Sequence, residues 1–253
     1  MRKNTKVVVT GIAGRIGHIA RQFLGERWEL SGVDLKSVKD FPSIIADINH
    51  QEALVPLFEG AYAVLHLAAN PNEKAPWCDI KGPNILGTQS VFEAARCAKV
   101  QKIIFASSNH VTGLYVNDEP YKSIMAGRYT GLNPANIPKI THTMPIRPDG
   151  PYGVSKAFGE ALGRYYAEVF GIQIICLRIG TINSENRPRS VDEYATLLTH
   201  NDLATLLEAC LRAEGVLFDI FYGVSANTWR FWDITHAQDI LGWVPQENAE
   251  SFR

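Results

Sequence analysis

The chain has 253 residues, of which 46% are hydrophobic and 20% are charged, a composition typical of a folded globular protein. Its formal net charge of −1 and its lack of a basic patch argue against nucleic acid or an anionic membrane as a partner. Four cysteines occur without CxxC spacing and outside any His/Cys cluster. We therefore expect no metal site and reduced thiols, with Cys97 and Cys176 buried.

The N-terminal residues lack the features of a signal peptide. Their apolar run is only Val7–Val9, and a glycine-containing turn follows it at once. No stretch of the sequence approaches the ~18–20 apolar residues that a membrane span requires. We therefore expect a cytoplasmic protein.

Short apolar strands alternate with helical segments as far as Arg178. The expected strands are Lys6–Thr10, Glu29–Val33, Ile44–Ala46, Ala63–Leu67, Lys102–Ala106 and Gln173–Arg178. The expected helices are Arg15–Leu24, Gln51–Phe58, Pro83–Lys99 and Tyr152–Phe170. This alternation predicts an α/β fold with a doubly wound parallel sheet of the Rossmann type. Because strands such as VVV are apolar without interruption, we expect helices on both faces of the sheet.

Two polar segments interrupt this alternation. Tyr115–Asp149 is rich in Pro, Gly, Asn and Thr, and Thr181–Val191 follows the last expected strand. Ligands of open α/β sheets bind beyond the carboxyl ends of the strands, so both segments are placed to contact a substrate. We expect one domain over residues 1–253, with a small C-terminal substrate lobe formed mainly by residues 111–150 and 181–253.

A glycine-rich turn joins the first expected strand to the first expected helix. The segment VVVTGIAGRIG carries three glycines at GxxGxxG spacing, namely Gly11, Gly14 and Gly17. Glycine allows backbone N–H groups to approach a pyrophosphate, and the N-terminus of the helix supplies partial positive charge. The turn therefore predicts a dinucleotide site.

Two aspartates bear on the identity of that dinucleotide. Asp34 ends the next expected strand, where a carboxylate accepts hydrogen bonds from the adenosine ribose and repels a 2′-phosphate, so we expect NAD. Arg15 and Lys36 leave NADP as the alternative. Asp47 ends the third expected strand, where it either reaches the adenine or caps the helix that starts at Gln51.

The pentapeptide YGVSK places Tyr152 and Lys156 at i and i+4 of a helix, on one face. A phenol has a reference pKa near ~10, and an adjacent ammonium is expected to lower it. The pair can then take a proton from a substrate hydroxyl while a hydride leaves the same carbon for nicotinamide. Ser107 and Ser108, at the end of a separate strand, complete this interpretation.

The sequence resembles the extended short-chain dehydrogenases/reductases, the NAD-dependent epimerase/dehydratase family. The resemblance covers nearly the whole chain and rests on TGxxGxxG, HLAA at His66–Ala69, NILGTxxVFEAA at Asn84–Ala95, FASS at Phe105–Ser108, YGVSK at Tyr152–Lys156 and LGWVP at Leu241–Pro245. It implies that Ser108 polarises the reacting oxygen. It also implies that Tyr152 is the acid/base, and that Lys156 tunes Tyr152 and holds the nicotinamide ribose.

With these motifs, the interpretation gives a set of cofactor-binding positions in addition to Tyr152 and Lys156. They are Gly11, Gly14, Arg15, Ile16, Gly17, Asp34, Leu35, Asp47, Ile48, Leu67, Ala68, Ala69, Asn84, Ser107 and Ile179. His66, at a strand end, is expected to be a core histidine rather than a ligand.

A narrower resemblance points to the uronate dehydrogenases, which oxidise the C1 hemiacetal of glucuronate or galacturonate to an aldarolactone with NAD. It rests on SSNH at Ser107–His110, RPDGPYGVSK at Arg147–Lys156, LRIG at Leu177–Gly180, YGVSANT at Tyr222–Thr228 and the following WRFWD. It implies that Ser108, Asn109 and His110 contact the sugar and that Thr181 replaces a serine. Arg187 or Arg189 would bind the C6 carboxylate, since guanidinium matches carboxylate in bidentate fashion. The alternative for each arginine is a solvated loop charge, and the alternative for His110 is a structural hydrogen bond from a loop.

The chain departs from these families at three places. Tyr152 follows Ser108 by 44 residues, so Tyr115–Asp149 contains an insertion that could shape the pocket or form a lid. Position 112, a tyrosine in many sugar epimerases, is Thr112. Only about 70 residues follow Gly180, which favours a simple sugar over a nucleotide sugar.

Several alternatives remain open on the sequence. They are a nucleotide-sugar epimerase or dehydratase, an NAD-dependent aldose or sugar-phosphate (glucose 6-phosphate) dehydrogenase, and a non-catalytic dinucleotide sensor. The sensor is disfavoured because Tyr152 and Lys156 are both present. Trp229 and Trp232 are expected to pack in the lobe rather than stack on nucleic acid. By analogy, the helices Pro83–Lys99 and Tyr152–Phe170 could pair in a homo-oligomer.

Overall fold

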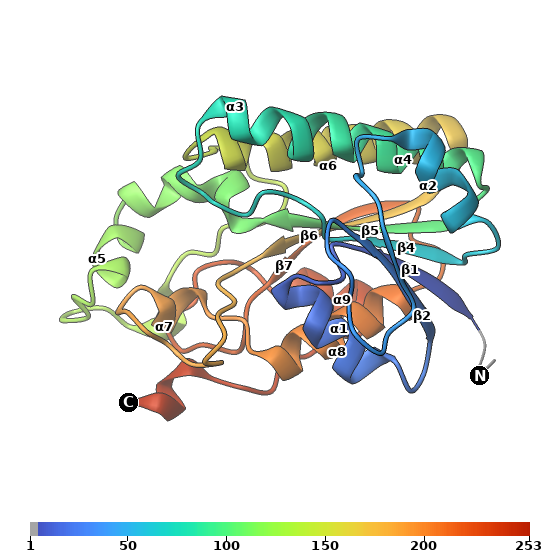
Figure 1. Ribbon diagram of the computed structural model, residues 1–253. Coiled ribbons are helices and arrows are strands. Elements are labelled where there is room, and N and C mark those ends of the chain that lie inside the picture. The colour runs from blue at the N-terminus through green and yellow to red at the C-terminus, as the bar shows by residue number, and fades with distance from the viewer. Residues whose placement is uncertain (1–4) are drawn as a thin grey trace.

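The computed structural model describes residues 5–253; residues 1–4, the start of the segment considered above for a signal peptide, lie outside the described part. A seven-stranded sheet runs through the centre in the order β3-β2-β1-β4-β5-β6-β7, and every neighbouring pair is parallel (Figure 1). The strands are β1 (Lys6–Thr10), β2 (Glu29–Asp34), β3 (Ser43–Ile45), β4 (Ala63–His66), β5 (Lys102–Ser108), β6 (Gln173–Ile179) and β7 (Phe218–Gly223). The prediction of a doubly wound parallel sheet is confirmed.

Helices cover both faces of the sheet. They are α1 (Arg15–Leu24), α2 (Gln51–Phe58), α3 (Trp77–Ile80), α4 (Gly87–Cys97), α5 (Tyr121–Met125), α6 (Pro151–Phe170), α7 (Glu193–Thr196), α8 (His200–Arg212) and α9 (Thr235–Leu241). In Figure 1, α2, α4 and α6 lie above the sheet, and α1, α8 and α9 lie below it. Val7 and Val9 pack in the core beneath the sheet and Val8 in the core above it, as side chains alternating on a doubly covered strand must.

The prediction of an α-helix over Pro83–Lys99 is wrong for the first turn. Residues Lys81–Leu86 form a π-helix that continues α3, and regular α-helix begins only at Gly87. Pro83 has no N–H to donate, and it lies within this wider turn instead of starting the helix. The turn directs Asn84 into the protein, where its side chain is 1% exposed.

Cys97 lies exposed near the end of α4, so its expected burial is wrong, whereas Cys176 is buried in β6. All four cysteines are free thiols. No helix within residues 5–253 is long and apolar enough to cross a membrane.

The polar segment Tyr115–Asp149 is ordered around a third hydrophobic cluster beside the sheet. Part of it continues the 3-10 helix Asn109–Asn117, and α5 follows. The cluster consists of Tyr115, Tyr121, Ile124, Ile137, Ile140, Ala195, Tyr222, Val224, Phe231 and Trp232. It joins the insertion to the C-terminal part of the chain through a bridge between Ile140 and Trp232. Within residues 181–253, β7 and α8 belong to the sheet and its lower layer.

Candidate active site

The glycine turn lies between β1 and α1, next to the end of β4. Gly11 has φ +77°, and a Cβ at this position would lie 2.7 Å from the Ala68 nitrogen. A Cβ at Gly17 would lie 2.5 Å from the Ile12 carbonyl oxygen. Only glycine therefore allows this close approach of the turn to its neighbours, and it leaves the first turn of α1 open for an anion.

Asp34 lies against this turn at the end of β2. Its Oδ2 accepts a hydrogen bond of 2.9 Å from the Ala13 backbone N–H, inside the GxxGxxG segment. The carboxylate is therefore fixed beside the position that a pyrophosphate would take. The adenosine ribose is attached to that pyrophosphate and would lie next to the carboxylate. Leu35, next in the chain, is 67% exposed and can cover an adenine.

Asp47 and Ile48 lie in the turn between β3 and α2. Asp47 accepts hydrogen bonds from the Asn49 backbone and side chain, both of 2.9 Å, and does not cap α2. Ile48 is 7% exposed and packs in the upper core, so only its backbone is available to a cofactor.

His66 is a buried core histidine, as the sequence predicts. One ring nitrogen lies 2.8 Å from the Thr10 hydroxyl and the other 3.1 Å from the Thr88 hydroxyl. Burial, with a smaller contribution from Lys156, lowers the pKa of His66 to about 3. The neutral ring holds the end of β4 in place, just before Leu67, Ala68 and Ala69.

Asn84 supports the cleft from the π-turn. Its Oδ1 accepts from the Asn70 N–H at 2.7 Å, and its Nδ2 donates to the Asn70 carbonyl and to Ser155 Oγ, both at 3.1 Å. The side chain thus ties the segment after β4 to helix α6, which carries Tyr152 and Lys156.

These residues together fit a dinucleotide. Close approach at Gly11, the open start of α1 and the Asp34 carboxylate are the three features such a cofactor requires. Arg15 does not face an acidic partner; its Nη1 donates to the Ile182 carbonyl at 2.9 Å. Ile16 is partly buried against the lower core, and Ile179 is 6% exposed at the end of β6.

Ser108 and Tyr152 meet at the carboxyl end of the sheet. Ser108 ends β5, and Tyr152 lies in the first turn of α6, which Pro151 starts. The Ser108 side chain lies beside the Tyr152 phenol, and its Oγ donates to Asn109 Oδ1 at 3.2 Å. Lys156 is 4% exposed, and its Nζ lies 5.6 Å from the centre of the Tyr152 ring. The structure therefore brings the three expected catalytic residues together.

The expected lowering of the Tyr152 pKa is wrong for this state of the protein. Burial, together with the nearby carboxylates of Glu73 and Asp149, raises the pKa of Tyr152 to about 12, although the Ser108 hydrogen bond opposes this. Burial also lowers the pKa of Lys156 to about 7. The physical reason is shared, since a site that excludes water disfavours both the phenolate and the ammonium.

A buried ion pair lies beside the end of β5 that carries Ser108. Arg178 on β6 donates to Glu160 on α6 through Nε at 2.9 Å and Nη2 at 2.8 Å. Ser107 Oγ donates to the same carboxylate at 2.6 Å. Tyr222 on β7 accepts from Arg178 at 3.1 Å and lies 2.9 Å from the Thr112 hydroxyl. This network fixes the end of β5 relative to α6, and Thr112 is part of it. No sequence motif predicts the network.

His110 contacts two carboxylates and Tyr152. Its Nδ1 lies 2.7 Å from Asp149 Oδ2, and its Nε2 lies 2.9 Å from Glu73 Oε2. Burial alone would lower the pKa of His110, but the two carboxylates outweigh burial and raise it. The ring packs edge-on against Tyr152, with centroids 5.7 Å apart. Glu73 and Asp149 are site residues that the sequence analysis does not predict.

Thr181 follows β6, and its Oγ1 lies 2.8 Å from the Thr196 hydroxyl. Arg187 donates to Glu185 at 2.9 Å, and Arg189 donates to Glu193 at 3.0 Å. Both arginines line a surface cavity, formed by Glu185, Arg187, Pro188, Arg189 and Phe252. Ser108 and Tyr152 do not line this cavity, so the structure does not bring the two arginines together with them.

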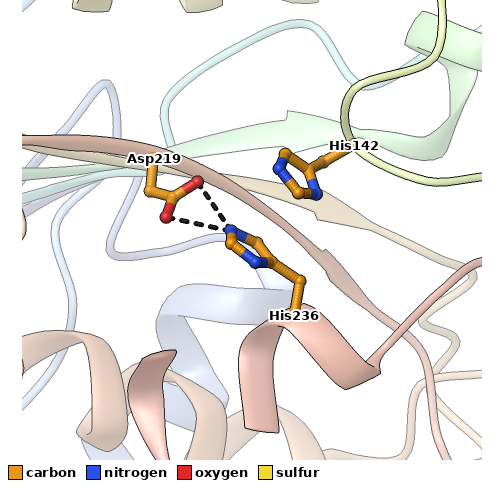
Figure 2. A group of neighbouring side chains, drawn as sticks. All are labelled: His142, Asp219 and His236. Carbon is orange, nitrogen blue, oxygen red and sulfur yellow. Dashed lines mark hydrogen bonds and ion pairs between the residues drawn. The ribbon is translucent and has the colours of Figure 1, made fainter. Parts of the chain in front are cut away.

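One group in the described part of the chain combines side chains that bind metals. Figure 2 shows His142 of the insertion, Asp219 of β7 and His236 of α9, and His236 Nε2 lies 2.9 Å from both Asp219 oxygens. The two imidazole rings are stacked, 3.8 Å apart and inclined by 14°. A histidine binds a metal along a nitrogen lone pair in the ring plane, so two nearly parallel stacked rings cannot both address one ion. In this arrangement the group anchors the insertion to the sheet edge.

Comparison with known proteins places these features in a family. The family model described as "NAD dependent epimerase/dehydratase family" matches residues 7–232. The NAD-dependent glucose-6-phosphate dehydrogenase of Haloferax volcanii is 32% identical, over 97% of this chain and 95% of that protein. From the same organism, L-arabinose 1-dehydrogenase (NAD(P)(+)) is 33% identical, over 96% of this chain and 97% of that protein. Uronate dehydrogenase of Pseudomonas putida is 35% identical, over 98% of this chain and 86% of that protein.

A solved structure shares the whole architecture. The crystal structure of uronate dehydrogenase from Agrobacterium tumefaciens superposes with a TM-score of 0.83 and 32% identity, covering 99% of this chain and 88% of that one. The similarity therefore includes both the sheet and the lobe beside it.

Proposed function

This chain belongs to the NAD dependent epimerase/dehydratase family, and from that premise we propose that it oxidises the C1 hemiacetal of a free sugar to a lactone. It is an NAD-dependent sugar dehydrogenase, as are the relatives that match it over nearly their full length. The observation that carries the proposal is the meeting of Ser108, Tyr152 and Lys156 at the sheet end beside the glycine turn.

NAD, when bound, supplies the hydride acceptor and a positively charged ring. The glycine turn would hold the pyrophosphate, and Asp34 would accept a hydrogen bond from the adenosine ribose. Ser108 donates a hydrogen bond to the reacting C1 oxygen, and Tyr152 accepts its proton as the C1–H electron pair leaves as hydride. The oxygen then forms a carbonyl with C1, and the product is a lactone. Lys156 would hold the nicotinamide ribose, and its ammonium form would counter the burial that raises the pKa of Tyr152.

Two substrate classes follow from different evidence. The motifs around Ser108 and Tyr152 favour a uronic acid such as glucuronate or galacturonate, whose carboxylate Arg187 or Arg189 would bind. That role requires the ion pairs with Glu185 or Glu193 to open, or to rearrange around the substrate. A neutral aldose is the second class, and the 33% identity to an L-arabinose 1-dehydrogenase supports it. The relatives include a dehydrogenase of each class and one that acts on a sugar phosphate.

A substrate panel tests the proposal. NADH formation is measured with glucuronate, galacturonate, glucose, arabinose and glucose 6-phosphate, for the wild type and for Tyr152→Phe. The wild type is expected to oxidise at least one of these sugars, and Tyr152→Phe to lose about 10²–10⁴-fold in kcat. A wild type that reduces no NAD with any of them, or a Tyr152→Phe variant of undiminished rate, would show the proposal to be wrong. A nucleotide-sugar epimerase would instead interconvert its substrates without net NADH.

A further inference from the structure

A buried tyrosine links the ion pair beside β5 to the segment that carries Ser108. Tyr222 on β7 is 1% exposed, and its hydroxyl group accepts a hydrogen bond of 3.1 Å from Arg178 Nη1. The same oxygen lies 2.9 Å from the hydroxyl group of Thr112, which is itself fully buried. Thr112 Oγ1 in turn donates to the Asn109 carbonyl at 3.2 Å. Groups from β6, β7 and the segment after β5 therefore form one continuous chain of hydrogen bonds.

The chemistry of the donors gives this chain a direction. A guanidinium group can only donate, so Arg178 uses Tyr222 as an acceptor and leaves the phenolic proton free. The Thr112 proton is used by the Asn109 carbonyl, because a carbonyl oxygen can only accept. The Tyr222 proton is therefore the one that fills the 2.9 Å contact with Thr112. Loss of either hydroxyl group would leave a buried partner without its hydrogen bond.

The chain of hydrogen bonds ends on the peptide group that contacts Ser108. The carbonyl of the Asn109–His110 peptide accepts from Thr112, and the N–H of the same peptide donates to Ser108 Oγ at 3.2 Å. A peptide group is planar, so fixing its carbonyl also fixes the direction of its N–H. With that N–H in place, the Ser108 oxygen is an acceptor on one side. Its own proton is left to donate, in this structure to Asn109 Oδ1 at 3.2 Å.

Tyr222 is itself held firmly, whereas the segment that it contacts is irregular. The Tyr222 ring packs in the third hydrophobic cluster beside Trp232, with ring centroids 6.2 Å apart and ring planes inclined by 26°. The 3-10 helix Asn109–Asn117 departs from helical geometry at Thr112, where φ is −119° and ψ is 21°. Because a 3-10 helix is weakly hydrogen-bonded and this one is interrupted, the buried side-chain contacts contribute more to the position of its first turn.

We propose that Tyr222 is a positioning residue for the oxidation, acting through Thr112 and the Asn109–His110 peptide on the Ser108 hydroxyl group. The inference rests on the proposed function, in which Ser108 donates to the reacting C1 oxygen. Tyr222 holds the Ser108 hydroxyl group in the orientation that the chemical step requires. Loss of the Tyr222 hydroxyl group therefore acts mainly on kcat and less on KM.

The test is a double-variant cycle in kcat, measured with the most active sugar of the substrate panel. Tyr222→Phe removes one hydroxyl group and keeps the ring, and Ser108→Ala removes the group through which Tyr222 acts. Thr112→Val loses the linking hydroxyl group, and Thr112→Ser keeps it. Tyr62→Phe is the matched control, because Tyr62 also donates from its hydroxyl group, to the Leu211 carbonyl at 3.3 Å, but precedes β4 at the opposite, amino end of the sheet.

Tyr222→Phe is expected to lower kcat about tenfold and to change KM for the sugar by less than about twofold, because Ser108 acts in the chemical step. In the Ser108→Ala background, the same replacement should lower kcat by less than about twofold, since no Ser108 hydroxyl group remains to be positioned. Thr112→Val should resemble Tyr222→Phe, and Thr112→Ser should keep most of the wild-type kcat. Tyr62→Phe should stay within about twofold of the wild type.

An equal fold loss from Tyr222→Phe with and without the Ser108 hydroxyl group would overturn the positioning role. A Tyr222→Phe variant as active as Tyr62→Phe would overturn it as well. Neither result affects the proposed function, which stands if the wild type forms NADH and Tyr152→Phe does not. If Tyr222→Phe fails to fold, the cycle of Thr112→Val with Ser108→Ala decides by the same comparison. A wild type that oxidises no sugar would overturn the proposed function, and the role of Tyr222 with it.

Discussion

Replacing Arg178 by methionine is expected to destabilise the protein strongly. The guanidinium is 2% exposed and makes two hydrogen bonds to the Glu160 carboxylate, which is 6% exposed. Without Arg178, Glu160 keeps only the bond from Ser107 and remains buried as an unpaired charge. Breaking such a pair costs about 3–5 kcal/mol. For a domain of this size, about 2–4 °C in Tm accompanies each kcal/mol, so Tm should fall by roughly 6–20 °C.

Thermal denaturation followed by circular dichroism measures this change. The matched control is Arg128→Met, because Arg128 is 58% exposed and contacts Glu119 only at 4.0 Å. Exposed pairs contribute about 0–1 kcal/mol, so the control should shift Tm by only a few degrees. The double variant Glu160→Met/Arg178→Met should recover part of the loss, since no buried charge remains. A Tm for Arg178→Met as high as that of the control would refute the assignment of a critical buried pair.

Three further predictions concern other parts of the structure. Asp34→Ser is expected to lower the ratio of kcat/KM with NAD to kcat/KM with NADP by at least about tenfold, because the carboxylate that repels a 2′-phosphate is lost. An unchanged ratio would contradict the role of Asp34 in rejecting NADP. His66 stays neutral when folded, with its pKa lowered to about 3, so the unfolded chain binds the extra proton below about pH 6.5. The free energy of unfolding should therefore fall with decreasing pH by up to about 1.4 kcal/mol per pH unit between roughly pH 6 and pH 4. His66→Gln should show a shallower dependence in urea titrations, and an equal slope would contradict this. Tyr165 and Val169 are 52% and 58% exposed one turn apart on α6, so we expect a homo-oligomer by light scattering. A mass of 28.1 kDa for the wild type would speak against it.

Local patterns explain which features the sequence could predict. The strands before Gly11 and Ser108 are short, apolar and bounded by glycine or polar residues, so period and length identify them. The i, i+4 spacing of Tyr152 and Lys156 likewise places both on one helix face without knowledge of the fold. Beyond Arg178 the sequence analysis assigns no elements, although α8, β7 and α9 follow there.

Long-range contacts explain what the sequence could not predict. Glu160 lies one turn beyond Lys156 on α6, and this spacing is the only local sign that it faces the site. Its partner Arg178 lies on strand β6. Asp149 meets His110 across 39 residues, and no motif marks Glu73. The pKa of Tyr152 was expected to fall because its neighbour is a lysine, but burial, which sequence spacing does not reveal, dominates both groups.

Deuterium transfer from C1 tests the central claim most directly. The sugar of highest turnover in the panel is supplied with deuterium at C1, together with NAD, and the reduced cofactor and the sugar product are analysed by mass spectrometry and NMR. We expect one deuterium in each NADH formed, a lactone or its hydrolysed acid as product, and loss of both in Tyr152→Phe. Deuterium retained on C1 of the sugar, or NADH formed without it, would contradict oxidation at C1.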